Sequence, residues 1–126
     1  MTIRKKIKRA NKHYKLANLY DDRHKYNKAY KHYIKALKLY PKYKKAECKK
    51  TKHNLKVSRE KSRLELLGDQ LREEKEEIRA ELIELRKDEE KNKDMIDMYK
   101  GRLRDIFEVE EIQLYEWMEL KTSKFE

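Results

Sequence analysis

Glycine, proline and cysteine are scarce in this chain of 126 residues, which contains two glycines, one proline and one cysteine. Two glycines leave little room for a loop that holds phosphate groups, and the sequence has no GxxxxGK[ST], GxGxxG, HExxH or GxSxG motif. None of the four histidines has a cysteine or a carboxylate four residues away, as a helical metal site would need. The sequence therefore predicts a protein that is not an enzyme and has no catalytic, cofactor-binding or metal-binding residues.

Long apolar runs and paired cysteines are missing as well. No segment approaches the roughly 20 apolar residues of a membrane-spanning helix, and Cys48 has no second cysteine with which to form an internal disulfide. A reducing, intracellular compartment is therefore expected, the cytoplasm in the first place. The mitochondrion is the alternative, because residues 1–20 are basic, contain no acidic residue and place Ile3, Ile7, Ala10 and Tyr14 on one helical face.

The residues typical of β-strands are also rare. Valine occurs only at Val57 and Val109, and no segment alternates apolar and polar residues with a period of two. Charged residues make up 47% of the chain, a share typical of long helices rather than of compact mixed folds. These features predict an all-α fold.

Charge is divided unevenly between the two halves of the chain. Residues 1–63 contain 23 lysines and arginines against four acidic residues, a net charge of +19, whereas residues 64–126 contain 12 against 20, a net charge of −8. A basic half of this density attracts polyanions in general, including RNA, DNA, anionic lipid and acidic protein segments. Charge alone does not choose among these partners.

A helix-turn-helix pattern begins at Ala10, and Pro41 ends its second helix. Small residues, Ala17, Ala29 and Ala36, fall where the two helices must approach closely. The second helix carries an apolar stripe with steps of three and four residues, formed by Tyr26, Tyr30, Tyr33, Leu37 and Tyr40. The pattern resembles a tetratricopeptide repeat (TPR), a resemblance that implies two packed helices and a surface for binding protein partners.

The same spacing is similar to that of the microtubule-interacting-and-transport domain, a three-helix bundle, but Pro41 favours the repeat. His24 stands where TPR repeats often end the first helix with a glycine in the left-handed conformation. Only one repeat is recognisable, so we expect a third helix to cap it. The expected organisation is a basic arm over residues 1–9, a TPR-like three-helix module over residues 10–63 and a helical arm over residues 64–126.

Lysines in the second and third helices recur at steps of three and four residues and predict two cationic ridges, which we call the lysine rails. The rails consist of Lys28, Lys31, Lys35, Lys38, Lys42, Lys45, Lys49, Lys52 and Lys56. Such a surface suits phosphates or an acidic peptide; the alternative interpretation is a solvated helix face.

From Leu64 onward the spacing is typical of a coiled coil, with a seam formed by Leu64, Leu67, Leu71, Ile78, Leu82 and Leu85. The capping third helix is expected to run into this long coiled-coil helix. Residues 86–94 contain no apolar residue, and apolar positions resume afterwards in a shifted phase. A continuous rod is favoured over a hairpin bent within residues 86–94.

A segment near the end of the chain combines an aromatic anchor with flexible methionine, which is typical of a contact surface. This C-terminal apolar segment contains Ile106, Phe107, Val109, Ile112, Leu114, Trp117, Met118 and Leu120. It predicts either contact with a foreign protein or a seam between two copies of this chain in a homodimer.

Together these features predict a scaffold or adaptor subunit that binds a protein partner with acidic or extended peptide segments. One repeat cannot bury its apolar faces alone, which also favours a partner. The alternative is an electrostatic RNA-binding subunit of a ribonucleoprotein. A further hypothesis is that the acidic block at residues 73–90 folds back against the lysine rails and masks them.

Overall fold

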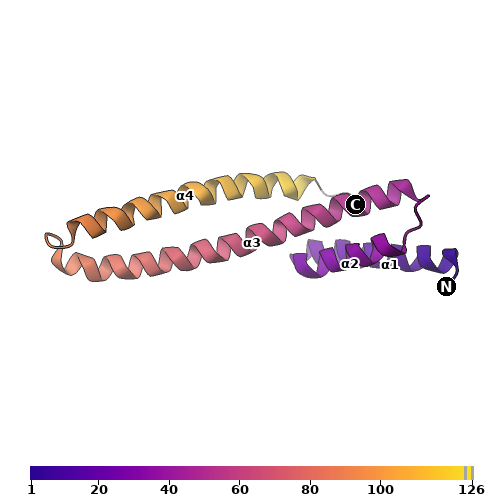
Figure 1. Ribbon diagram of the computed structural model, residues 1–126, viewed down its shortest axis with the longest axis horizontal. Helices are drawn as coiled ribbons and strands as arrows, with labels where there is room; N and C mark the ends of the chain where they lie inside the picture. Colours follow the sequence, from indigo (N-terminus) through magenta and orange to yellow (C-terminus); the bar gives the residue numbers. More distant parts are fainter. Residues whose placement is uncertain (124, 126) are drawn as a thin grey trace. The chain divides into compact units, whose positions relative to one another are not determined.

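The computed structural model describes residues 1–123 and 125, and over these residues the chain is helical without any β-strand. Its elements are α1 (Ile3–Asp22), α2 (Tyr26–Leu39), α3 (Lys45–Leu85), the short 3₁₀ helix η1 (Arg86–Asp88) and α4 (Lys93–Thr122) (Figure 1). The predicted all-α fold is confirmed. The chain forms two compact units, and α3 contributes to both: a three-helix unit of Met1–Arg63 with Glu119–Glu126, and a hairpin unit of Leu64–Met118.

The first helix begins earlier than the sequence analysis expected. Thr2 is its N-cap, and the Thr2 hydroxyl oxygen accepts a hydrogen bond from the Lys5 backbone N–H at 3.3 Å. The separate basic arm expected over residues 1–9 is therefore wrong, because α1 already begins at Ile3. At the other end of α1, His24 adopts a φ of 60°, in the left-handed region that TPR repeats often give to a glycine at this position.

The close approach of α1 and α2 depends on alanine, as the spacing predicted. Ala10 and Ala17 of α1 and Ala29 and Ala36 of α2 are completely buried. Tyr33 is completely buried as well, and its ring meets the Tyr14 ring edge-on with centroids 5.8 Å apart. Tyr26 and Tyr33 of α2 thus lie in the core of the three-helix unit, whereas Tyr30 of the predicted stripe is only partly buried.

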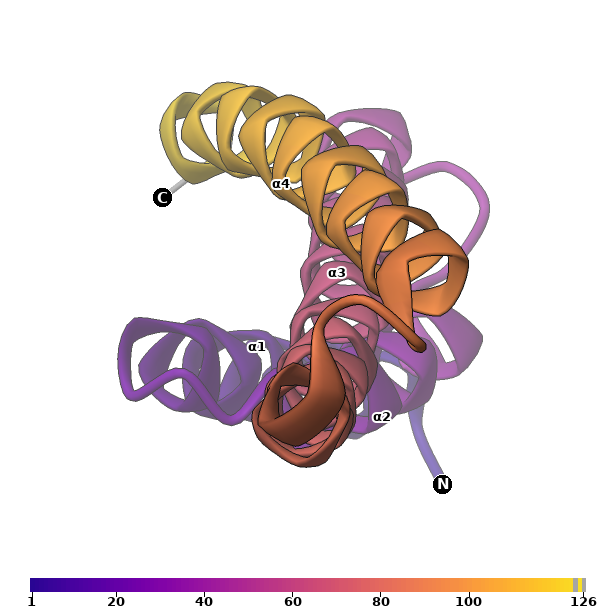
Figure 2. The same cartoon turned by 90° about the vertical axis from the view of Figure 1, so that its left-hand side faces the viewer.

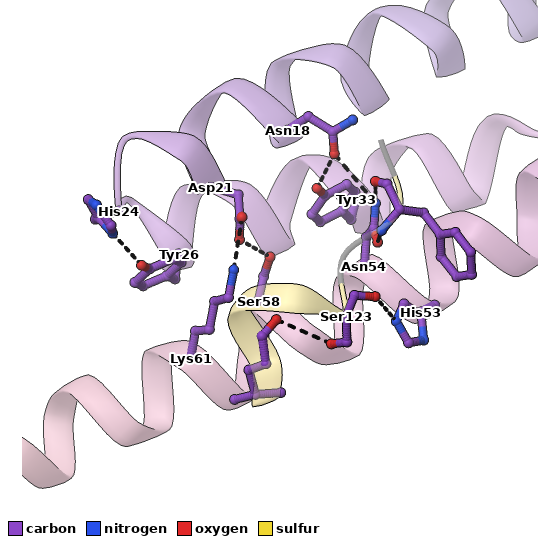
Figure 3. Close-up of polar contacts among 12 residues, drawn as sticks. Asn18, Asp21, His24, Tyr26, Tyr33, His53, Asn54, Ser58, Lys61 and Ser123 are labelled. Atoms are coloured by element: carbon purple, nitrogen blue, oxygen red, sulfur yellow. Dashed lines mark hydrogen bonds and ion pairs between the residues drawn. The ribbon is translucent and has the colours of Figure 1, made fainter. Parts of the chain in front are cut away.

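The part of α3 that packs in the three-helix unit buries mainly polar side chains. Val57 is its one buried apolar residue, and the buried polar positions follow steps of three, four and three residues: Thr51, Asn54, Ser58 and Lys61. Ser58 Oγ and Lys61 Nζ both donate to the buried carboxylate of Asp21 in α1, at 2.9 and 3.1 Å (Figure 3). Among the described residues no buried side-chain nitrogen or oxygen lacks a hydrogen-bond partner, so this polar interface satisfies the rule for buried polar groups.

In the hairpin unit, α4 runs back along the second part of α3, and Figure 2 looks along these two helices from the turn that joins them. The predicted seam of α3 is buried at Leu64, Leu71, Ile78 and Leu82, and the last three form one apolar cluster with Ile96 and Ile106 of α4. Across the pair, the Arg102 guanidinium donates two hydrogen bonds to the Glu74 carboxylate at 2.6 and 2.9 Å, and Lys75 Nζ contacts Glu110 at 2.9 Å.

The continuous rod favoured by the sequence analysis is therefore wrong, since the chain reverses between η1 and α4. Residues 86–94 contain no apolar residue that a straight helix would have to keep covered. The reversal is stabilised locally, because the Asn92 side-chain amide donates to the Leu85 carbonyl at 3.0 Å. Turning back allows one chain to bury its own seam.

Glycine has a packing role at one place in the hairpin. A Cβ atom at Gly68 would lie 2.9 Å from Nε2 of Gln113, whose side chain crosses from α4 and donates to the Leu64 carbonyl. Gly68 thus allows a polar side chain of α4 to reach the backbone of α3.

Candidate functional site

All nine residues of the lysine rails are exposed on the three-helix unit. Four of them converge on one surface hollow of about 450 Å³ at the junction of α2 and α3, lined by Lys42, Lys45, Lys49 and Lys52 together with Leu37, Tyr40 and Cys48. We call this the lysine hollow. The other five rail lysines, Lys28, Lys31, Lys35, Lys38 and Lys56, do not line it. Four of the nine predicted rail lysines thus line the same hollow.

The local sequence explains why these lysines meet. Pro41 is incompatible with a continuing α2, and Tyr40 before it has an extended backbone with a ψ of 128°. The chain then turns and α3 begins at Lys45, so that Lys42 lies in the turn and Lys45 and Lys49 lie one helical turn apart.

The lining between the lysines is apolar and fixed in place. Tyr40 is buried, and its hydroxyl donates to Oδ1 of Asn11 in α1 at 2.6 Å. Burial, assisted by the negative charge of Glu47, raises the pKa of Tyr40 to about 12. The Tyr40 hydroxyl is therefore protonated and turned into the unit, and cationic side chains surround a hollow with apolar lining.

A histidine pair links α1 and α2. Nδ1 of His13 lies 3.0 Å from Nδ1 of His32, and the two rings stack with centroids 5.2 Å apart. On its other side the His32 ring stacks on Tyr20 at 5.3 Å. Burial lowers the pKa of both histidines, and the charge of Lys35 lowers both further. The contact between these helices thus favours uncharged imidazoles.

This pair predicts a loss of stability in mild acid. Since both pKa values lie below 6.5 in the folded chain, the unfolded chain binds more protons just below that pH. The stabilising contribution is complete above pH 6.5 and is lost as the pH falls through the lowered pKa values. We expect the melting temperature to fall between about pH 7.5 and pH 5.5, and to fall less in His13→Gln/His32→Phe. Equal pH dependence of the variant and the wild type, measured by circular dichroism, would contradict this.

The structure divides the C-terminal apolar segment. Ile106 is completely buried in the hairpin core, and Trp117 and Leu120 are partly buried. The remaining five members are exposed: Phe107, Val109, Ile112, Leu114 and Met118. Phe107, Leu114 and Met118 recur at steps of seven and four residues, which places them on one face of α4. We call this face of three residues the α4 apolar face.

A polar group that the sequence analysis missed lies in the three-helix unit. Asn54 of α3 is completely buried, and its side-chain amide forms two hydrogen bonds with the backbone of Phe125: Nδ2 donates to the Phe125 carbonyl at 2.6 Å, and Oδ1 accepts from the Phe125 N–H at 2.8 Å. The one signal in the sequence is that α3 has few apolar residues between residues 44 and 63. That signal indicates an unusual interface but does not identify its partner.

Neighbouring side chains fix the orientation of this amide. Asn54 Nδ2 also donates to the Tyr14 hydroxyl at 3.0 Å, and the acceptor Asn18 Oδ1 lies 3.5 Å from the same nitrogen. Asn18 Oδ1 in turn accepts a hydrogen bond from the buried Tyr33 hydroxyl (Figure 3). Burial raises the pKa of Tyr33 well above its usual value, so this hydroxyl remains a donor. The amide nitrogen of Asn54 is thereby held toward the Phe125 carbonyl.

Residues 1–123 and 125 contain neither a metal-type side-chain cluster nor a membrane-spanning helix. Within this part of the chain no three histidine, cysteine or acidic side chains are grouped as a metal ion would require. None of the helices described there combines the length and apolar character needed to cross a membrane.

Comparison of the chain with family models, with curated proteins and with solved structures gave no match. The resemblance to TPR repeats therefore stays a prediction.

Proposed function

We propose that this chain is a non-enzymatic adaptor that binds a protein partner carrying acidic or extended peptide segments, in a reducing intracellular compartment. The observation that carries the proposal is the lysine hollow, where Lys42, Lys45, Lys49 and Lys52 surround the apolar lining of Leu37, Tyr40 and Cys48. A peptide segment that places a carboxylate next to an apolar side chain satisfies both parts of this surface. A purely solvated helix face would have no need of the apolar lining.

Binding of RNA is the alternative, and the net charge of residues 1–63 favours it. Proteins that bind single-stranded RNA commonly stack bases on exposed aromatic rings. Here Tyr26, Tyr33 and Tyr40 are buried in the core of the three-helix unit, whereas Tyr43 is 63% exposed. This distribution leaves few rings for bases and favours the peptide.

The α4 apolar face gives the adaptor a second surface. Phe107 is 50% exposed, and Leu114 and Met118 are each 57% exposed. Exposed apolar side chains that share one face are typical of a contact surface. We assign this face to the assembly that the adaptor joins; a second copy of this chain is the alternative occupant.

The decisive experiment compares two charge reversals of equal size. In the hollow variant Lys42, Lys45, Lys49 and Lys52 are replaced by glutamate; in the matched control Lys28, Lys31, Lys35 and Lys38 are replaced. The probe is a labelled peptide that alternates glutamate with leucine, and fluorescence anisotropy gives the affinity. We expect the hollow variant to bind at least about tenfold more weakly than the wild type, and the control variant to lose less than about threefold.

Labelled single-stranded RNA is titrated in parallel at low and near-physiological salt. Electrostatic RNA binding weakens by about 0.7 in log affinity per log unit of salt for each neutralised phosphate. The adaptor proposal is wrong if RNA binding survives near-physiological salt and both lysine variants weaken the peptide equally. Equal loss would mean that only the summed charge matters.

A further inference from the structure

Asn54 is placed to recognise a peptide backbone rather than a particular side chain. The Asn54 side-chain amide donates to the carbonyl of Phe125 and accepts from the N–H of the same residue. Both backbone groups of one residue are available in this way only outside a helix, and α4 ends at Thr122, before Phe125. The site therefore suits an extended segment.

Side chains around Asn54 add contacts to the same short segment. His53 Nε2 donates to the Ser123 carbonyl at 2.5 Å, and the His53 ring meets the Phe125 ring edge-on with centroids 4.8 Å apart. The Tyr14 hydroxyl of α1 donates to the Phe125 carbonyl at 3.3 Å. Backbone contacts give affinity for any extended segment, and the His53 ring adds a preference for an aromatic side chain at the Phe125 position.

The backbone of Phe125 is bound in this site, but its side chain is only partly buried. Phe125 is 43% exposed, and its backbone is bound while much of its ring remains in water. An empty site would leave the buried amide of Asn54 without these partners, which is costly. Exchange for another segment with the same backbone groups avoids that cost, so the site favours replacement of its occupant over release.

Resting on the adaptor function proposed above, we propose that Asn54 is a backbone clamp for an extended partner segment with an aromatic side chain. The chain's own Ser123 and Phe125 occupy the clamp as an internal ligand, which the partner segment must displace. The masking expected from the acidic block at residues 73–90 is a different contact; Glu74 of that block pairs with Arg102 in the hairpin unit. An internal ligand acts at a high effective concentration and so weakens every competing segment.

The test uses a labelled synthetic peptide with the sequence of residues 119–126 as the probe. It is titrated into the full chain and into a chain that ends at Thr122, whose helicity is checked by circular dichroism. We expect the shortened chain to bind the peptide at least about tenfold more tightly, because it lacks the competing internal segment. Equal affinity for the two proteins, or no binding to a folded shortened chain, would overturn the proposal.

Modified peptides test the clamp without changing the protein. N-methylation at the Phe125 position removes the N–H that donates a hydrogen bond to Asn54 Oδ1. This change should weaken binding at least about tenfold. N-methylation at the Lys121 position is the matched control and should have little effect. Equal effects of the two methyl groups would exclude a clamp at this residue.

A second protein variant covers the case in which the shortened chain does not fold. In the full-length Phe125→Pro variant the segment is present but has no N–H for Asn54, so the added peptide should bind at least about tenfold more tightly than it binds the wild type. Unchanged affinity would overturn the proposal. The four-lysine variants test the adaptor function independently of the clamp. If the clamp proposal fails, their result still applies to the lysine hollow; if the lysine hollow fails, the peptide titrations still test the clamp.

Discussion

Replacing Asp21 by alanine is expected to lower the free energy of unfolding by about 3–5 kcal/mol. The change leaves Lys61, which is only 5% exposed, without the carboxylate that it contacts at 3.1 Å. The Ser58 hydroxyl loses the same acceptor. Urea denaturation followed by far-UV circular dichroism measures the loss.

The matched control removes both charges together. In the Asp21→Leu/Lys61→Met variant no charge remains buried and unpaired, so we expect most of the lost stability to return. The apolar stem of Lys61 already lies beside the Tyr26 ring, with Nζ 5.4 Å from the ring centroid, and a methionine fits against the same ring. If the double variant is as unstable as Asp21→Ala, the pair contributes through its specific hydrogen bonds and not through charge balance.

The second large effect is expected in the hairpin unit. Ile106→Ala should lower the free energy of unfolding by about 2–5 kcal/mol, because Ile106 is completely buried against the α3 seam and its removal leaves a cavity. Trp117 is the only tryptophan of the chain and lies in the same unit. Its fluorescence in urea therefore reports on this unfolding transition.

Ile112→Ala is the control for the same chemical change at an exposed position of α4. Ile112 is 59% exposed, and its replacement should change stability by no more than about 0.5 kcal/mol. The two isoleucines belong to one apolar segment in the sequence, and only the structure separates them. Equal losses from the two variants would mean that Ile112 is buried in solution, as it would be in a homodimer.

Periodicity predicted the elements with an apolar or small-residue pattern. Ala17, Ala29 and Tyr33 are completely buried where the spacing placed them, since a helix that packs closely on another must show small and apolar residues at steps of three and four. These features depend on residues within one turn or one helix pair.

Most contacts of α3 within the three-helix unit were missed because they are polar. The spacing of a buried helix face is present at Thr51, Asn54, Ser58 and Lys61. Hydrophobic periodicity, however, predicts burial for apolar residues and exposure for lysine. Their burial depends on partners remote in sequence, such as Asp21, and a hydrogen-bond partner leaves no periodic signal of its own. The same limit explains why Asn54 was not predicted as a site residue.

The sequence by itself determined the all-α fold, the packed pair α1 and α2, the seam of α3 and the asymmetry of charge, because each follows from composition or from spacing along one helix. Only the tertiary structure decided three other features: that the chain reverses after Leu85, that four of nine rail lysines meet at one hollow, and that Asn54 holds the backbone of Phe125. Each of these depends on contacts between segments far apart in the chain, which folding brings together and sequence spacing does not record.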